Sequence, residues 1–79
     1  MEELVRYIVE HLVDNKEDVS VEMNNDSETS STIYISAKPS IIGKIIGKNG
    51  KIASSIRQIV KTASANSGKK YYVQIIEKQ

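Results

Sequence analysis

The spacing of hydrophobic and polar residues predicts six structural elements along this chain. From Glu2 to Asp14 the apolar residues recur every three or four positions, which lays one apolar stripe along a helix. Residues 19 to 24 and residues 32 to 37 alternate apolar with polar side chains, as half-buried strands do. A segment rich in Asn, Asp and Ser separates the two strands and predicts a hairpin or a longer loop.

The second half of the chain predicts two helices and a last strand. Pro39 ends the second strand and suits the first turn of a helix, so a short helix is expected from about Ser40 to Ile46. A longer helix is expected from about Gly50 or Lys51 to residues 66–68, and a strand over residues 71–76. The order αββααβ predicts an α+β domain with a three-stranded sheet and all three helices packed on one face.

The two central helices are joined by a Gly-x-x-Gly turn that consists of Gly47, Lys48, Asn49 and Gly50. Glycine allows positive φ and a close approach of the backbone to a ligand, because it has no Cβ. The first N–H groups of the following helix, and the positive end of its dipole, point into the same turn. The turn therefore predicts a phosphate-binding site, although glycines at such a junction also serve chain reversal alone.

Charge is distributed unevenly along the 79 residues. Residues 1 to 38 hold nine acidic and three basic side chains, a net charge of −6, whereas residues 39 to 79 hold eight basic and one acidic, a net charge of +7. Such asymmetry indicates a basic face for a polyanion. Two solvated faces of opposite sign are the alternative, and Arg57 and Lys61 are consistent with both.

Several other kinds of site are not expected. The chain has no cysteine, which excludes disulfides and thiolate ligands and fits a reducing compartment. The nucleotide-binding pattern G-x-x-x-x-G-K-[ST] fails because, counting from Gly43, Lys48 stands where its second glycine belongs. His11 is the sole histidine, at the border of an apolar stripe. We therefore expect no enzyme, metal site, cofactor or small-molecule substrate.

The N-terminal residues lack the basic start and the long apolar run of an export signal, and no apolar run approaches the ~20 residues of a membrane span. A cytoplasmic protein that does not contact membranes is expected.

The segment Ile46 to Gly50 between two helices resembles the signature of the KH domain, and the preceding helix and strand resemble its type II form. Residues 4–15, residues 43–53 and the final strand resemble the KhpA family of small bacterial single-KH proteins. The resemblance implies one KH domain over residues 1–79, with a helix-strand extension over residues 1–24 and a βααβ core over residues 32–77.

The resemblance also implies that the chain binds single-stranded RNA, with the sugar-phosphate backbone on the turn and bases in an apolar groove. It implies a role as an RNA chaperone with a second KH protein, KhpB, and a link to cell-envelope homeostasis and cell-length control. The RNA-contacting candidates are Gly47, Lys48, Asn49, Gly50, Lys44, Lys51, Ile46, Ile42 and Ile35. For the isoleucines among these candidates, packing in the protein core is the alternative role.

The rival hypothesis is a protein-interaction module whose long helix meets another KH domain, in a homodimer or in a heterodimer with a KhpB-like protein. In that case RNA contacts come mainly from the partner. Few aromatic residues are present, so base stacking is expected to be minor and affinity to be micromolar or weaker. The dimer candidates are Ile52, Ile56, Ile59 and Val60.

Overall fold

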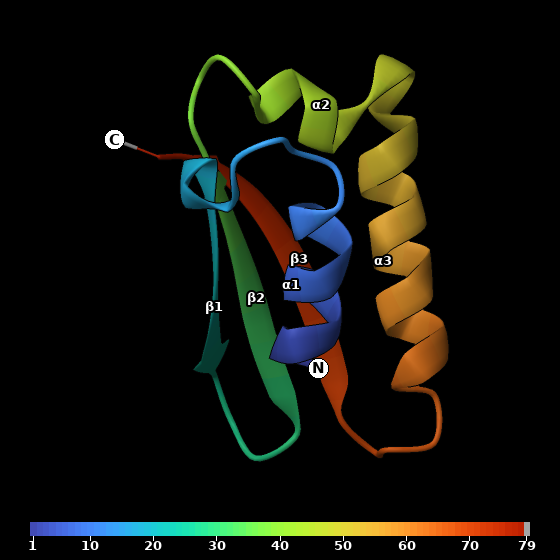
Figure 1. Cartoon of the computed structure of the whole chain (residues 1–79). Coiled ribbons are helices and arrows are strands. Elements are labelled where there is room, and N and C mark those ends of the chain that lie inside the picture. Colours follow the sequence, from blue (N-terminus) through green and yellow to red (C-terminus); the bar gives the residue numbers. More distant parts are fainter. Residues whose placement is uncertain (79) are drawn as a thin grey trace.

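The computed structural model describes residues 1 to 78 and has the expected αββααβ order (Figure 1). Two short 3₁₀ turns, η1 and η2, precede β1 and α3. The α+β prediction is thereby confirmed. The elements are α1 (Glu2–Glu10), η1 (Lys16–Asp18), β1 (Val19–Asn25), β2 (Ser30–Ala37), α2 (Ile42–Ile46), η2 (Lys48–Gly50), α3 (Lys51–Ala63) and β3 (Lys70–Glu77).

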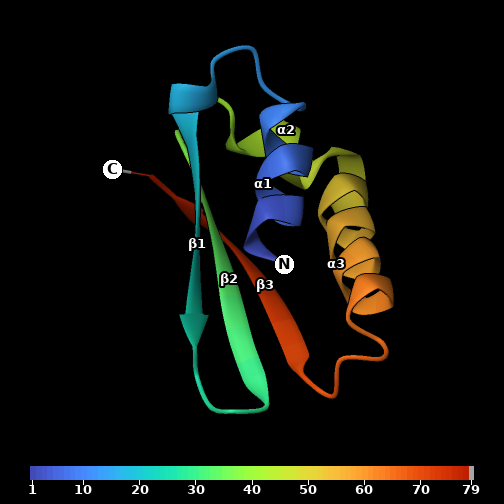
Figure 2. The same ribbon diagram turned by 60° about the horizontal axis from the view of Figure 1, so that its bottom comes forward.

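The three strands form one mixed sheet in the order β1-β2-β3. β1 runs antiparallel to β2, with Val21 opposite Ile35, and β3 runs parallel to β2, with Val73 beside Ile33. A parallel pair needs a crossover connection, which α2 and α3 supply. Figures 1 and 2 show α1, α2 and α3 on the same side of the sheet, so no helix of the described residues covers the opposite face.

A single hydrophobic core joins the inner face of the sheet to one stripe of each helix. Because strand side chains alternate, the inner residues of β2 are fully buried while Tyr34 and Ser36 between them are only half-buried. The three helices reach the same core, which is why they share one face of the sheet. Its fully buried apolar members are Val5 and Val9 from α1, Ile33, Ile35 and Ala37 from β2, Ile45 from α2, and Ile56 and Val60 from α3.

The helices are shorter than their hydrophobic patterns predict. α1 ends at Glu10 rather than Asp14, because the amides of His11 and Leu12 donate to carbonyls only three residues back, at 3.2 and 3.0 Å. α2 starts at Ile42 because the Lys38 carbonyl closes a turn ahead of it. α3 likewise ends at Ala63, before residues 66–68. At the end of α1 the apolar spacing continues into the tighter turn with Leu12 and Val13, so the pattern alone overestimates the length of this helix.

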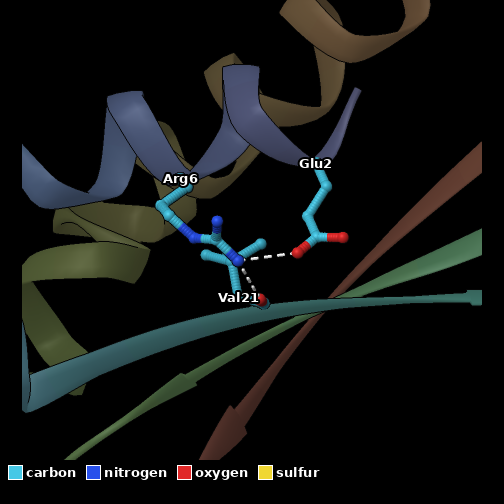
Figure 3. A network of polar contacts seen from close by, with 3 residues as sticks. All are labelled: Glu2, Arg6 and Val21. Carbon is cyan, nitrogen blue, oxygen red and sulfur yellow. Dashed lines mark hydrogen bonds and ion pairs between the residues drawn. The ribbon is translucent and has the colours of Figure 1, made fainter.

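Arg6 fastens α1 to the sheet at the edge formed by β1 (Figure 3). Its guanidinium donates to the Val21 carbonyl at 3.0 Å and to the Glu2 carboxylate at 2.6 Å. The contact holds α1 over β1, at one edge of the sheet, whereas α3 borders β3 at the other edge.

Candidate nucleic-acid interface

The Gly-x-x-Gly turn lies between α2 and α3 and is built from unusual backbone angles. Gly47, Asn49 and Gly50 all have positive φ, at 77°, 57° and 73°. Asparagine is among the side chains that best tolerate this left-handed region, and glycine adopts it freely. The turn therefore requires residues that tolerate positive φ at three of its four positions, and the sequence provides glycine or asparagine at each of them.

The two glycines of the turn are required for different reasons. At Gly47 an added Cβ would lie 2.6 Å from Cγ1 and 2.8 Å from the backbone nitrogen of Ile52, which leaves no space for any side chain. Its angles, φ 77° and ψ 170°, also belong to a region that is essentially restricted to glycine. At Gly50 an added Cβ would meet nothing within 4 Å, so only the backbone angle favours glycine there.

Two amides of the turn have no backbone acceptor among the described residues. The Gly47 amide donates to the Gly43 carbonyl at 2.8 Å, and the Gly50 amide donates to the Gly47 carbonyl at 3.1 Å. Within residues 1–78 no backbone acceptor is found for the amides of Lys48 and Asn49. Of the four turn residues, Lys48 and Asn49 therefore have the N–H groups that the backbone leaves without a partner.

Positive charge and an exposed apolar side chain surround the turn. Lys44, Lys48 and Lys51 are exposed, and none of them forms an ion pair with another described residue. The ion pairs found in residues 1–78 involve other basic residues, so the charge beside the turn is not neutralised. Ile46 is 38% exposed and immediately precedes Gly47, whereas Ile42 is half-buried.

Three of the candidate contact residues lie in the core instead, and these predictions were wrong. Ile35 is completely buried, because it occupies the inner side of the middle strand beneath the helices. Ile56 and Val60 are each 1% exposed, because they form the stripe of α3 that packs on the sheet. Ile52 is half-buried against Gly47, and Ile59 alone among the dimer candidates is clearly exposed, at 42%.

A second feature is an open hollow of about 710 Å³ between the later part of α3, the loop that follows it and β3, which we call the α3–β3 hollow. Lys69 is held at its rim, donating to the Asn25 side-chain oxygen at 3.1 Å and lying 5.7 Å from the Tyr71 ring centre. The hollow therefore combines positive charge with aromatic surface. Its basic and aromatic lining residues are Arg57, Lys61, Lys69, Lys70, Tyr71 and Tyr72.

Sequence reasoning considered Arg57 and Lys61 but missed the other residues of the hollow. A signal was present, since residues 69 to 72 read Lys-Lys-Tyr-Tyr and thus place two cations beside two aromatic rings. Only the parallel pairing of β3 brings this segment next to α3. Two of the chain's four tyrosines, Tyr71 and Tyr72, consequently lie among basic residues in this hollow.

Within residues 1–78 no helix has the length and apolar character to cross a membrane, and no cluster of three or more metal-binding side chains occurs. His11 is exposed, and its ring packs on that of Tyr7, with 4.3 Å between the ring centres.

A βααβ core with a Gly-x-x-Gly turn between its helices defines a KH domain, a class of nucleic-acid-binding module. The model of the KhpA/KhpB KH-domain family matches residues 2–75, and the chain belongs to this family. The RNA-binding protein KhpA of Clostridium perfringens is 44% identical over 78 residues, covering 96% of this chain and all of that protein. KhpA of Listeria monocytogenes is 40% identical over 77 residues, covering 98% of this chain and all of that protein.

The solved structures that this chain resembles show the same fold. Era of Aquifex aeolicus matches 96% of this chain with a TM-score of 0.68 and 17% identity. Era in complex with a segment of 16S ribosomal RNA matches 96% of this chain with a TM-score of 0.63 and 20% identity. The chain spans 29% of each Era chain.

Proposed function

We propose that this protein binds single-stranded RNA through the Gly47–Gly50 turn and acts in the cytoplasm as an RNA chaperone with a KhpB-like partner. The observation that carries the proposal is the pair of free amides, at Lys48 and Asn49, among exposed lysines that lack ion pairs. Its KhpA relatives are named RNA-binding proteins, and an Era chain, 29% of which matches the fold of this chain, was solved with RNA. Family membership is the basis for extending the proposal to post-transcriptional regulation of cell-envelope homeostasis and cell shape.

In this mechanism a phosphate accepts hydrogen bonds from the two free amides while the nearby lysines provide Coulombic attraction. Ile46, which is exposed beside the turn, offers apolar contact to a base. α3 then leads to the α3–β3 hollow: Lys51 and Lys61 are ten residues apart, or about 15 Å along the helix axis. Arg57 and Lys61 lie one turn apart on one flank and extend the positive track into the hollow.

The salt dependence of binding tests the role of the three lysines near the turn. Changing Lys44, Lys48 and Lys51 together to glutamine is expected to reduce the slope of log affinity against log salt by roughly 2, because each phosphate contact on a single strand contributes roughly 0.7. Fluorescence anisotropy with a labelled single-stranded RNA over a salt series measures this slope.

The matched control is Lys16→Gln, since Lys16 is exposed but lies in the acidic half of the chain and has Glu10 3.9 Å away. This change should leave the slope unaltered. An unchanged slope in the triple variant would mean that the phosphates bind elsewhere, and the proposal would then be abandoned.

A second function, pairing with another KH domain, is favoured by the exposure of Ile59. Ile52 and Ile59 are seven residues apart on one flank of α3, whereas Arg57 and Lys61 occupy the other. Pairing through Ile59 would therefore leave the α3–β3 hollow open to RNA. Domains of this small size also commonly gain stability by oligomerisation.

Sedimentation of an Ile59→Glu variant tests the pairing proposal. We expect the wild-type chain to sediment as a dimer at high concentration and the variant as a monomer, because a carboxylate buried in an apolar interface has no partner. Ile76→Glu is the matched control, since Ile76 is also 42% exposed but lies on β3, and it should leave the dimer intact. A wild-type monomer that also fails to pair with a KhpB-like protein would contradict the proposal.

A further inference from the structure

No helix of residues 1–78 covers the outer face of the sheet (Figure 2), yet β3 carries an exposed aromatic ring on this face. Tyr72 is 53% exposed and pairs in register with Thr32 of β2. Because strand side chains alternate, Lys70 and Gln74 lie on the same face, on either side of Tyr72, and both are exposed. An exposed ring between a lysine and an amide suits the stacking and hydrogen bonding of a single nucleobase.

The α3–β3 hollow reaches this outer face. Tyr71 and Val73, which line the hollow, belong to the core side of β3, whereas Tyr72 and Gln74, which also line it, belong to the outer side. Consecutive residues from both sides of β3 thus place the hollow along the free edge of this strand. A nucleic acid strand lying in it has Tyr72 at its exit.

Charge favours the β3 side of the outer face for a polyanion. Lys70 has no ion-pair partner among the described residues. On the opposite side of the same face, Glu22 of β1 pairs in register with Tyr34 and repels phosphate. A strand emerging from the hollow is thus confined to β3 and directed to Tyr72 rather than across the sheet.

Taking the RNA binding proposed above as its basis, we propose that RNA leaving the α3–β3 hollow continues around the edge of β3 and stacks a base on Tyr72. Tyr72 thereby extends the bound length beyond the turn and the hollow. A protein partner fits this patch less well, because the polar Gln74 separates Tyr72 from the other exposed apolar residue of β3, Ile76, and protein interfaces are depleted in lysine at their centres.

The test compares a short oligonucleotide, of about the four nucleotides that a Gly-x-x-Gly loop clamps, with a single strand about three times as long. Tyr72→Val removes the ring while keeping a side chain that favours a strand. We expect it to weaken binding of the long RNA about tenfold, from the loss of one stacked base, and to leave the short RNA unaffected. Tyr72→Phe keeps the ring and should retain wild-type affinity for both lengths.

Tyr7→Ala is the remote control, since Tyr7 is 61% exposed on α1, and thermal melting verifies that each variant is folded. Equal weakening for both lengths, or no weakening for either, would overturn the role of Tyr72 while leaving the turn as the RNA site. If Tyr72→Val changed the sedimentation of the chain without changing its RNA affinity, this face would be assigned to a protein contact. The proposed role of Tyr72 in RNA binding would then also be overturned. If the wild-type chain bound neither RNA, the proposed function itself would fail.

Discussion

Changing Lys48 and Asn49 together to aspartate is expected to weaken RNA binding by roughly 100-fold and to abolish crosslinking. The double variant alters the charge of the turn by three units, each contributing about 1 kcal/mol against a phosphate at contact distance in water, and 1.4 kcal/mol corresponds to a factor of ten in affinity. Both glycines remain, and aspartate tolerates the positive φ of position 49 nearly as well as asparagine. The melting curve should therefore be almost unchanged.

The chain contains a closely matched control for this experiment. Asn15 and Lys16 repeat the same pair of residue types at η1, next to the β1 edge, where the Asn15 side chain caps the turn by accepting from the Glu17 amide at 3.0 Å. Aspartate caps such turns equally well, so Asn15→Asp with Lys16→Asp gives the same net charge without a comparable structural loss. If this control weakened binding as much as the variant at the turn, the effect would be one of overall charge and the turn would lose its assigned role.

The largest expected loss of stability follows from Gly47→Ala. A methyl group at this position would clash with the Cβ and backbone nitrogen of Ile52, both at 2.8 Å, and neither atom can rotate away. The unfavourable backbone angles cost about 1–3 kcal/mol, and overpacking adds about 1–3 kcal/mol. A chain of this size has a free energy of unfolding of only about 4–12 kcal/mol, so much of its stability would be lost.

Thermal and denaturant unfolding of Gly47→Ala and Gly50→Ala measure the difference directly. Gly50 shares the positive φ but has open space around it, so its substitution should cost only about 1–2 kcal/mol. At about 4–8 °C per kcal/mol for a domain of this size, the melting temperature of Gly47→Ala should fall markedly further than that of Gly50→Ala. Equal losses for the two variants would contradict the close packing of Gly47 on Ile52.

Together the two experiments separate the roles of the four turn residues. Gly47 and Gly50 hold the backbone shape, and Gly47 also allows α3 to pack closely. Lys48 and Asn49 present the free amides. If RNA binding were lost only in variants that also unfold, the turn would make no contact with RNA. Loss of RNA binding in a variant that remains folded would locate the contact at the turn.

The sequence by itself determined the order of the elements, the position of the turn and its chemical character. Helices and strands have different periodicities, so alternating positions in β2 and positions three or four apart in α3 are visible without coordinates. The turn was predictable because positive φ strongly restricts residue choice, so Gly-Lys-Asn-Gly between two helical patterns indicates a tight reversal of the chain. These features depend on neighbours in the chain.

The tertiary structure decided which similar side chains face solvent. Ile35, Ile46, Ile56 and Ile59 are the same residue type, yet Ile35 and Ile56 are buried while Ile46 and Ile59 are exposed. Their exposure depends on how the helices lie on the sheet, a relation between segments far apart in the sequence. The α3–β3 hollow has the same origin, since the Lys-Lys-Tyr-Tyr segment meets α3 only after β3 has paired in parallel with β2. Periodicity records which face of an element is apolar, and packing alone determines how much of that face its neighbours cover.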